Sequence, residues 1–177
     1  MSTKVVTGKV RFSYANVWEP KSVNGSEPKY SVSIIIPKSD TKSIDKIKAA
    51  IEAAKQDGVS KLGGKIPANL KTPLRDGDID RADDEAYIDS FFVNANSLTR
   101  PGIVDKDVQP IIDQTEFYSG CYGRASIIFY AYNANGNKGI AAGLQNLQKL
   151  EDGEPLSGKS RPEDDFGPVE IEEDFLG

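Results

Sequence analysis

The side chains best suited to binding a flat, charged ligand lie between residues 117 and 147. Residues 124–132, R-A-S-I-I-F-Y-A-Y, are rich in aromatic and β-branched residues and predict a strand. Alternation places Arg124, Tyr130 and Tyr132 on one face of this strand, opposite an apolar core face. Unpaired bases stack on exposed rings while phosphates pair with neighbouring cations, so this face predicts binding to a single-stranded nucleic acid. The alternative is that a loop or a second protomer covers the two tyrosines.

The residues after this strand predict a hairpin. Asn135-Gly136 is a strong turn signal because both residue types accept positive φ. Residues 138–144 then return as the partner strand and begin with a cation, Lys138. Small residues in the return strand, including Gly139 and Gly143, would allow a ligand or another chain to approach the backbone.

A second set of rings and cations lies near the N-terminus. Residues 4–17 predict one long strand, with Val6, Val10, Phe12 and Tyr14 on one face and with Lys9 and Arg11 on the other. Trp18 follows at the end of this strand, either as a stacking platform or as a plug for the core. Strand parity yields eight candidate DNA-binding residues, four for stacking and four for phosphates: Tyr130, Tyr132, Trp18 and Tyr122, and Arg124, Lys9, Arg11 and Lys138.

Three further elements complete the predicted domain. Residues 29–36 predict a second strand, and residues 39–58 predict the one clear helix, with a cap at Ser39, Asp40 or Thr41 and an end at Gly58. Residues 59–86 predict an irregular region. Residues 87–96 predict a strand in which Phe91 and Phe92 face opposite sides, so that one is core and the other is a base platform or lies under a loop.

Composition excludes several kinds of catalysis. The chain has no histidine and a single cysteine, which removes Ser-His-Asp and Cys-His catalysis, zinc fingers and iron–sulfur sites. We interpret Cys121 as a small structural residue in a reducing compartment. No apolar run has the length of a membrane span, and the first residues do not resemble a secretory signal. We expect neither a cofactor nor a metal.

The acidic residues of the loop at 76–84 leave one enzymatic alternative. Asp76, Asp78, Asp80 and Asp84 could serve a magnesium-dependent nuclease. Their spacing does not fit a calcium loop, however, and a two-metal site needs carboxylates from several elements. A solvated turn in which Arg75 and Arg81 pair with some of these acids is the favoured interpretation, so we predict no enzyme activity.

The charge is divided unevenly along the chain. Residues 1–150 contain 20 basic and 17 acidic residues, whereas residues 151–177 contain two basic and ten acidic residues. The last segment has too few apolar residues to fold alone. We therefore predict a binding domain over residues 1–150 and a flexible acidic tail over residues 151–177.

Taken together, these segments resemble a family of bacteriophage and prophage single-stranded DNA-binding proteins. The resemblance covers nearly the whole chain, and its most specific parts are F-Y-S-G-C-Y-G-R at 117–124 and N-G-N-K-G at 135–139. Weaker matches include S-I-I-I-P-K-S-D at 33–40, P-L-R-D-G-D at 73–78 and R-P-E-D-D-F at 161–166.

This resemblance implies a mainly β fold with one helix, namely a five-stranded OB-fold barrel followed by the long acidic C-terminal tail. It implies sequence-independent binding of single-stranded DNA in phage replication or recombination, in the cytoplasm of the bacterial host. The tail resembles those that recruit replication or recombination proteins, although it ends D-F-L-G rather than in Pro-Phe. A homodimer is possible. The alternative function is a phage structural or assembly protein whose aromatic face is a protomer interface.

Overall fold

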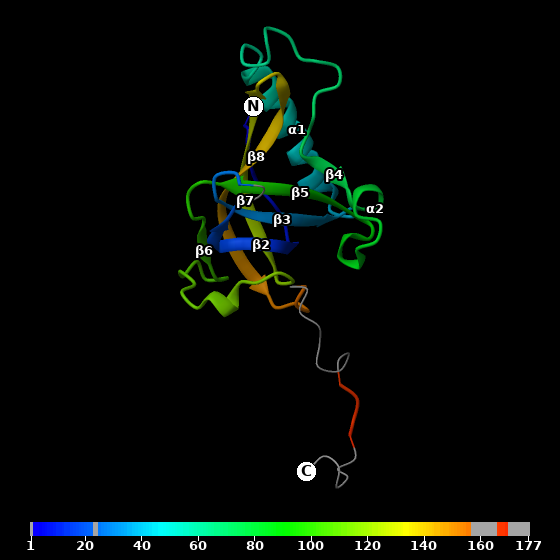
Figure 1. Cartoon of the computed structure of the whole chain (residues 1–177), viewed down its shortest axis with the longest axis vertical. Helices are drawn as coiled ribbons and strands as arrows, with labels where there is room; N and C mark the ends of the chain where they lie inside the picture. Colours follow the sequence, from blue (N-terminus) through cyan, green and yellow to red (C-terminus); the bar gives the residue numbers. More distant parts are fainter. Residues whose placement is uncertain (1, 23–24, 157–165, 170–177) are drawn as a thin grey trace.

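A computed structural model describes residues 2–22, 25–156 and 166–169 of the chain (Figure 1). The strands are β1 Lys4–Val6, β2 Val10–Lys21, β3 Lys29–Pro37, β4 Leu74–Asp76, β5 Ser90–Ser97, β6 Gly102–Val104, β7 Tyr122–Ala134 and β8 Asn137–Glu151. The helices are α1 Thr41–Asp57 and the short α2 Gly77–Asp80, with 3-10 turns η1 Glu85–Tyr87 and η2 Gln114–Glu116. No helix within the described ranges combines the length and apolar character that a membrane crossing requires.

Five strands form a closed ring around the main core. The hydrogen-bonded order β7-β2-β3-β5-β8 closes on itself because β7 also pairs with β8. Large buried side chains, among them Phe12, Ile34, Phe117 and Phe129, fill the interior. β1 extends the ring beside β7, β6 pairs with β8, and β4 pairs with β5. This mainly β, OB-like arrangement with one main helix confirms the predicted fold class in its broad form.

Helix α1 forms where the sequence predicts it. The Asp40 carboxylate caps the helix by accepting from the Ser43 amide at 3.1 Å, and Gly58 ends it. Ile44, Ile47 and Ile51 are buried on one face. In Figure 1 the helix lies beside the far half of the β7–β8 hairpin, which extends beyond the ring.

The N-terminal strand differs from its predicted form in two ways. It divides into β1 and β2 at residues 7–9, and β2 contains a bulge where its register with β3 shifts between Ser13 and Asn16. Each irregularity moves side chains to the opposite face. Val6 and Tyr14, predicted on the core face, are therefore exposed, whereas Val10 and Phe12 are buried as expected.

The β7–β8 hairpin follows the predicted parity. Ala125, Ile127, Phe129 and Ala131 are buried, whereas Arg124 and Tyr130 are exposed. The turn forms at Asn135-Gly136, and both residues have positive φ.

Both glycines of the return strand lie against side chains of the same hairpin. A Cβ at Gly139 would overlap the Tyr132 hydroxyl, and one at Gly143 would press against the Ile128 side chain. The close approach that these small residues allow is therefore used within the hairpin itself.

The F-Y-S-G-C-Y-G segment holds the residues that follow β8. The Tyr118 hydroxyl donates to the Asp152 carboxylate at 2.9 Å, and the Ser119 carbonyl accepts from the Leu156 amide at 2.8 Å. Gly120 has a φ of +118°, and a Cβ there would overlap the Glu154 carbonyl. Residues 152–156 therefore pack against the domain, while 157–165 and 170–177 of the predicted tail lie outside the described residues.

Replacing Gly120 by alanine should destabilise the domain by about 2 kcal/mol, because the side chain is both strained at this φ and blocked by Glu154. A urea titration followed by circular dichroism would measure the change. Gly64→Ala is the matched control, since Gly64 also has positive φ but has open space around it. Equal losses for the two variants would contradict a specific contact at Gly120.

Candidate nucleic-acid interface

Three of the predicted residues meet where β2 pairs with the start of β7. Arg11 and Tyr122 are direct cross-strand partners. The Lys9 ammonium lies 5.4 Å and the Arg11 guanidinium 5.2 Å from the centre of the Tyr122 ring. A half-buried ring with two cations on it is suited to hold a base beside its phosphates. We call these three residues the Tyr122 cluster.

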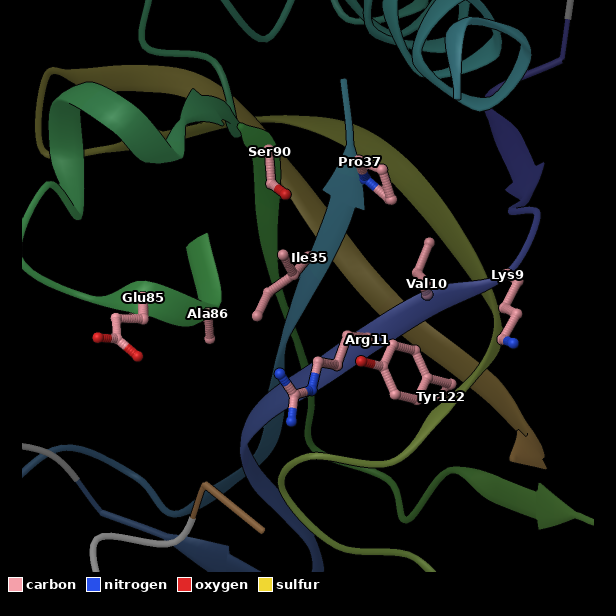
Figure 2. A pocket seen from close by; sticks show the side chains of 9 residues that line it. All are labelled: Lys9, Val10, Arg11, Ile35, Pro37, Glu85, Ala86, Ser90 and Tyr122. Atoms are coloured by element: carbon pink, nitrogen blue, oxygen red, sulfur yellow. The ribbon is translucent and has the colours of Figure 1, made fainter. Parts of the chain in front are cut away.

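A cavity of about 290 Å³ opens beside the Tyr122 cluster (Figure 2). Val10, Ile35 and Pro37 give it apolar walls, and Ala86 and Ser90 come from the segment on its other side. Figure 2 shows the Tyr122 ring and the Arg11 guanidinium along one side and Ser90 on the opposite side. The cavity therefore offers an aromatic and apolar surface with the cations of the Tyr122 cluster on one side and Glu85 among its other lining residues.

The cations of this cluster are already bonded within the chain. Lys9 forms an ion pair with Glu151 at the end of β8. Arg11 donates to the Gly120 carbonyl at 3.0 Å and to the Glu154 carbonyl at 2.7 Å. These bonds orient the guanidinium beside the Tyr122 ring. The Lys9–Glu151 pair is exposed on both sides, so it costs little to exchange for a phosphate.

Sequence parity missed a second group of aromatic and cationic side chains on the same side of the closed sheet. Tyr14 has a φ of 47° at the β2 bulge, and its side chain is 55% exposed. The Arg81 guanidinium lies 5.3 Å from its ring centre and also covers the rings of Tyr87 and Phe92. Arg81 was expected to pair with acids, yet it stacks on rings instead. We call Tyr14 and Arg81 the bulge platform.

The segment between α2 and β5 covers the middle of this face. Tyr87 is fully buried against Ile35 and Phe92, and its hydroxyl donates to Ser33 at 2.7 Å. Burial raises the pKa of the Tyr87 phenol above its ordinary value. Phe92 is thus the phenylalanine that lies under a covering segment, whereas Phe91 packs against the main core.

The acidic loop forms a structural network. Lys38 bonds the carboxylates of Asp78 and Asp76, which raises the pKa of Lys38 and, through the same bond, lowers the pKa of Asp78. Arg75 pairs with Asp80 at 2.8 Å, as predicted for a solvated turn. Asp84 accepts from the Ala86 amide. Over the described part of the chain, no group of three or more potential ligands is placed to hold a metal ion.

The other predicted residues lie apart from the Tyr122 cluster. Because β7 is 13 residues long, Tyr130 and Tyr132 lie toward its opposite end, near α1 and Lys138. Tyr130 is 43% exposed, and Tyr132 is half-buried over Gly139. Their role in DNA binding or in a protomer interface stays a prediction.

Arg124 and Trp18 both make contacts within the chain. Arg124 donates to the Thr7 carbonyl at 3.0 Å and so holds the turn between β1 and β2. Trp18 is half-buried against the core, and its indole N–H donates to the Phe117 carbonyl at 3.0 Å. This geometry is that of a core plug, the second of the two predicted roles for Trp18. Cys121 is buried, and burial raises the pKa of its thiol, as expected for a structural residue.

A closed, OB-like sheet with exposed aromatic and cationic side chains on one face is typical of nucleic-acid-binding proteins. The family model described as the ssDNA-binding protein of Enterobacter phage Enc34 matches residues 3–176. The chain belongs to this family, which is one of binding proteins. This chain is also 34% identical over 163 residues to putative protein p50 of Acyrthosiphon pisum secondary endosymbiont phage 1. The match covers 88% of this chain and 87% of that protein.

Solved structures show the same relationship. The single-stranded DNA-binding protein from bacteriophage Enc34, in complex with ssDNA, superposes with a TM-score of 0.78 at 27% identity, over 88% of this chain and 90% of that one. Bacteriophage T7 gp2.5, a single-stranded DNA-binding protein, gives a TM-score of 0.64 at 14% identity, over 97% of this chain and all of the other, and so supports the fold alone. These matches confirm the predicted family.

Proposed function

We propose that this chain binds single-stranded DNA across the outer face of β2 and β3, with the Tyr122 cluster as its principal contact. The observation that carries this proposal is the Tyr122 ring, which lies at a cavity with the Lys9 and Arg11 cations within 5.4 Å of its centre. The bulge platform supplies a second ring and cation farther along β2. The Enc34 relative, solved in complex with ssDNA, supports this ligand.

The proposed contacts favour a single strand of any sequence. Stacking on an aromatic ring is worth about 1–3 kcal/mol per base and needs a free base face, which a duplex does not offer. Lysine and arginine contacts to phosphates carry no sequence information. Binding of this kind serves DNA replication or recombination, which for a phage takes place in the cytoplasm of the host. The acidic tail, in this proposal, recruits replication or recombination proteins.

Affinity should fall steeply as salt rises. For an oligo-dT of about 12 nucleotides, the logarithm of the association constant should decrease linearly with the logarithm of salt concentration, by roughly 0.7 for each phosphate neutralised. Fluorescence anisotropy at four salt concentrations would measure this slope.

A duplex of the same length provides the control, and it should compete poorly at every salt concentration because its bases are already stacked. Binding that ignores salt, or that favours the duplex, would contradict the proposal.

A further inference from the structure

Two lysines face each other at the far end of the β2–β3 pair. Lys21 and Lys29 are direct cross-strand partners, and both are exposed. Like charges at directly opposite positions destabilise a sheet. Among the residues that the structure describes, neither ammonium forms an ion pair with an acid, although Glu27 lies nearby. Repulsion between the two ammonium groups therefore destabilises this end of the β2–β3 pair, and a bound anion would relieve the repulsion.

A hollow of about 300 Å³ lies beside this lysine pair. Amide and hydroxyl groups line it together with the charged side chains: Asn16, Lys21, Ser26, Glu27, Lys29, Ser31 and Asn96. Ser31 pairs in register with Asn16 on β2 and with Asn96 on β5, so three strands contribute to one polar surface. The Asn16 amide is oriented by donating to the Tyr14 carbonyl at 3.2 Å and to the Ser31 hydroxyl at 3.3 Å. Amide, hydroxyl and ammonium donors are the groups that contact phosphate and sugar.

This hollow lies on the same face as the Tyr122 cluster. Residues on one face of a strand alternate, so Ile35, Ser31 and Lys29 of β3 share a side. Ile35 lines the cavity at the Tyr122 cluster, and Ser31 and Lys29 line the hollow. At about 3.3 Å per residue, Ile35 and Lys29 are roughly 20 Å apart. On β3, Ser33 lies between Ile35 and Ser31 and is covered by Tyr87. On the neighbouring β2, the Tyr14 ring of the bulge platform is exposed between the cavity and the hollow.

We propose that Lys21 and Lys29, with the side chains of Asn16 and Asn96, form a second phosphate-binding subsite for the same DNA strand. One strand then runs from the Tyr122 cluster past Tyr14 to the lysine pair. This inference rests on the proposed function. It adds the place where the DNA leaves this face of the protein and the length of DNA that is needed to reach every contact. A strand that stacks at ~3.4 Å per nucleotide needs about six nucleotides to cover this distance.

The experiment compares two lengths of oligo-dT on the full chain. An oligonucleotide of about 12 nucleotides can reach both ends of the face, whereas one of about 3 nucleotides covers only roughly 10 Å. Lys21→Ala with Lys29→Ala should weaken binding of the longer strand on the order of tenfold at low salt. It should also lower the salt slope by about 1.4, because two phosphate contacts are lost. Binding of the shorter strand, followed by NMR titration, should change less than twofold.

The matched control removes two exposed lysines of α1, Lys42→Ala with Lys46→Ala, and makes the same change in net charge. It should leave both lengths nearly unaffected. Thermal denaturation should show the Lys21/Lys29 variant at least as stable as the wild type, since a repulsive pair is removed. The second subsite would be overturned if the Lys21/Lys29 variant lost no more affinity than the Lys42/Lys46 variant. It would also be overturned if the Lys21/Lys29 variant lost affinity equally for the long and the short oligo-dT. The proposed function would still stand if the wild type binds both oligonucleotides with the expected salt dependence.

Discussion

Removing Tyr122 and Lys9 together, as Tyr122→Ala with Lys9→Ala, is expected to weaken oligo-dT binding about a hundredfold. Loss of one stacking platform costs about 1–3 kcal/mol, which is around thirtyfold at its midpoint, and loss of the Lys9 phosphate contact adds a further few-fold. Fluorescence anisotropy with an oligo-dT of about 12 nucleotides in low salt measures the change. The ion pair of Lys9 with Glu151 is exposed on both sides, so its removal should not unfold the domain.

Two control variants make this test specific. Tyr122→Phe keeps the ring beside both cations and should bind within about threefold of the wild type, because stacking does not need the hydroxyl. Tyr130→Ala with Lys138→Ala removes the same two residue types from the β7–β8 hairpin, and its affinity should change little. A large loss from the hairpin variant, without one from the Tyr122 variant, would place the DNA on the Tyr130 face of the β7–β8 hairpin. An altered oligomeric state in the hairpin variant, seen by light scattering, would instead point to a protomer interface there.

Tyr14→Gly should separate binding from stability. Glycine accepts the φ of 47° without a side-chain penalty, so thermal stability should hold or rise by about 1 kcal/mol. The same change removes the exposed ring of the bulge platform, so affinity for oligo-dT should fall about tenfold. Differential scanning calorimetry and anisotropy on the same preparation measure both quantities.

Asn135→Gly is the matched control for this variant. Asn135 also has positive φ, 54°, in the turn of the β7–β8 hairpin, away from the bulge platform. Because asparagine already tolerates positive φ, this variant should change little in stability, and it should not lose affinity. If Tyr14→Gly keeps full affinity, Tyr14 is not a stacking residue, and the strained bulge would then serve only the sheet.

Local sequence signals were sufficient for most of the secondary structure. The Asp40 cap, the isoleucine stripe and Gly58 predict α1 within a few residues, because these signals act through contacts inside the helix itself. Alternation likewise predicts both faces of β7, since the strand is regular over the residues that face the core. Parity failed at Val6 and Tyr14, where a break and a bulge reverse the faces. Gly8 lies in the break, and a glycine inside a strand pattern is a signal that parity alone does not use.

The candidate site could be predicted only in its chemistry. Tyr122, Lys9 and Arg11 were all identified from parity, but their meeting depends on the pairing of β2 with β7, more than a hundred residues apart. Tyr130 and Trp18 looked equally suitable. Tyr130 lies toward the opposite end of β7 and the Trp18 indole donates to the Phe117 carbonyl, so their part in DNA binding stays a prediction. Arg81 looked like a partner for acids because its neighbours in sequence are acidic, whereas its guanidinium lies over the rings of Tyr14, Tyr87 and Phe92.

Residue types and their local periodicity therefore determined that this chain is a mainly β domain with one helix, with aromatic and cationic side chains suited to unpaired bases. They also excluded histidine-dependent catalysis, zinc fingers and iron–sulfur sites. Only the tertiary structure decided which of those side chains share one surface, because closure of the ring brings together strands that are distant in the sequence. Register and a single bulge turned Tyr14 toward that surface, and a one-residue shift of this kind reverses a side chain without changing the composition of the strand.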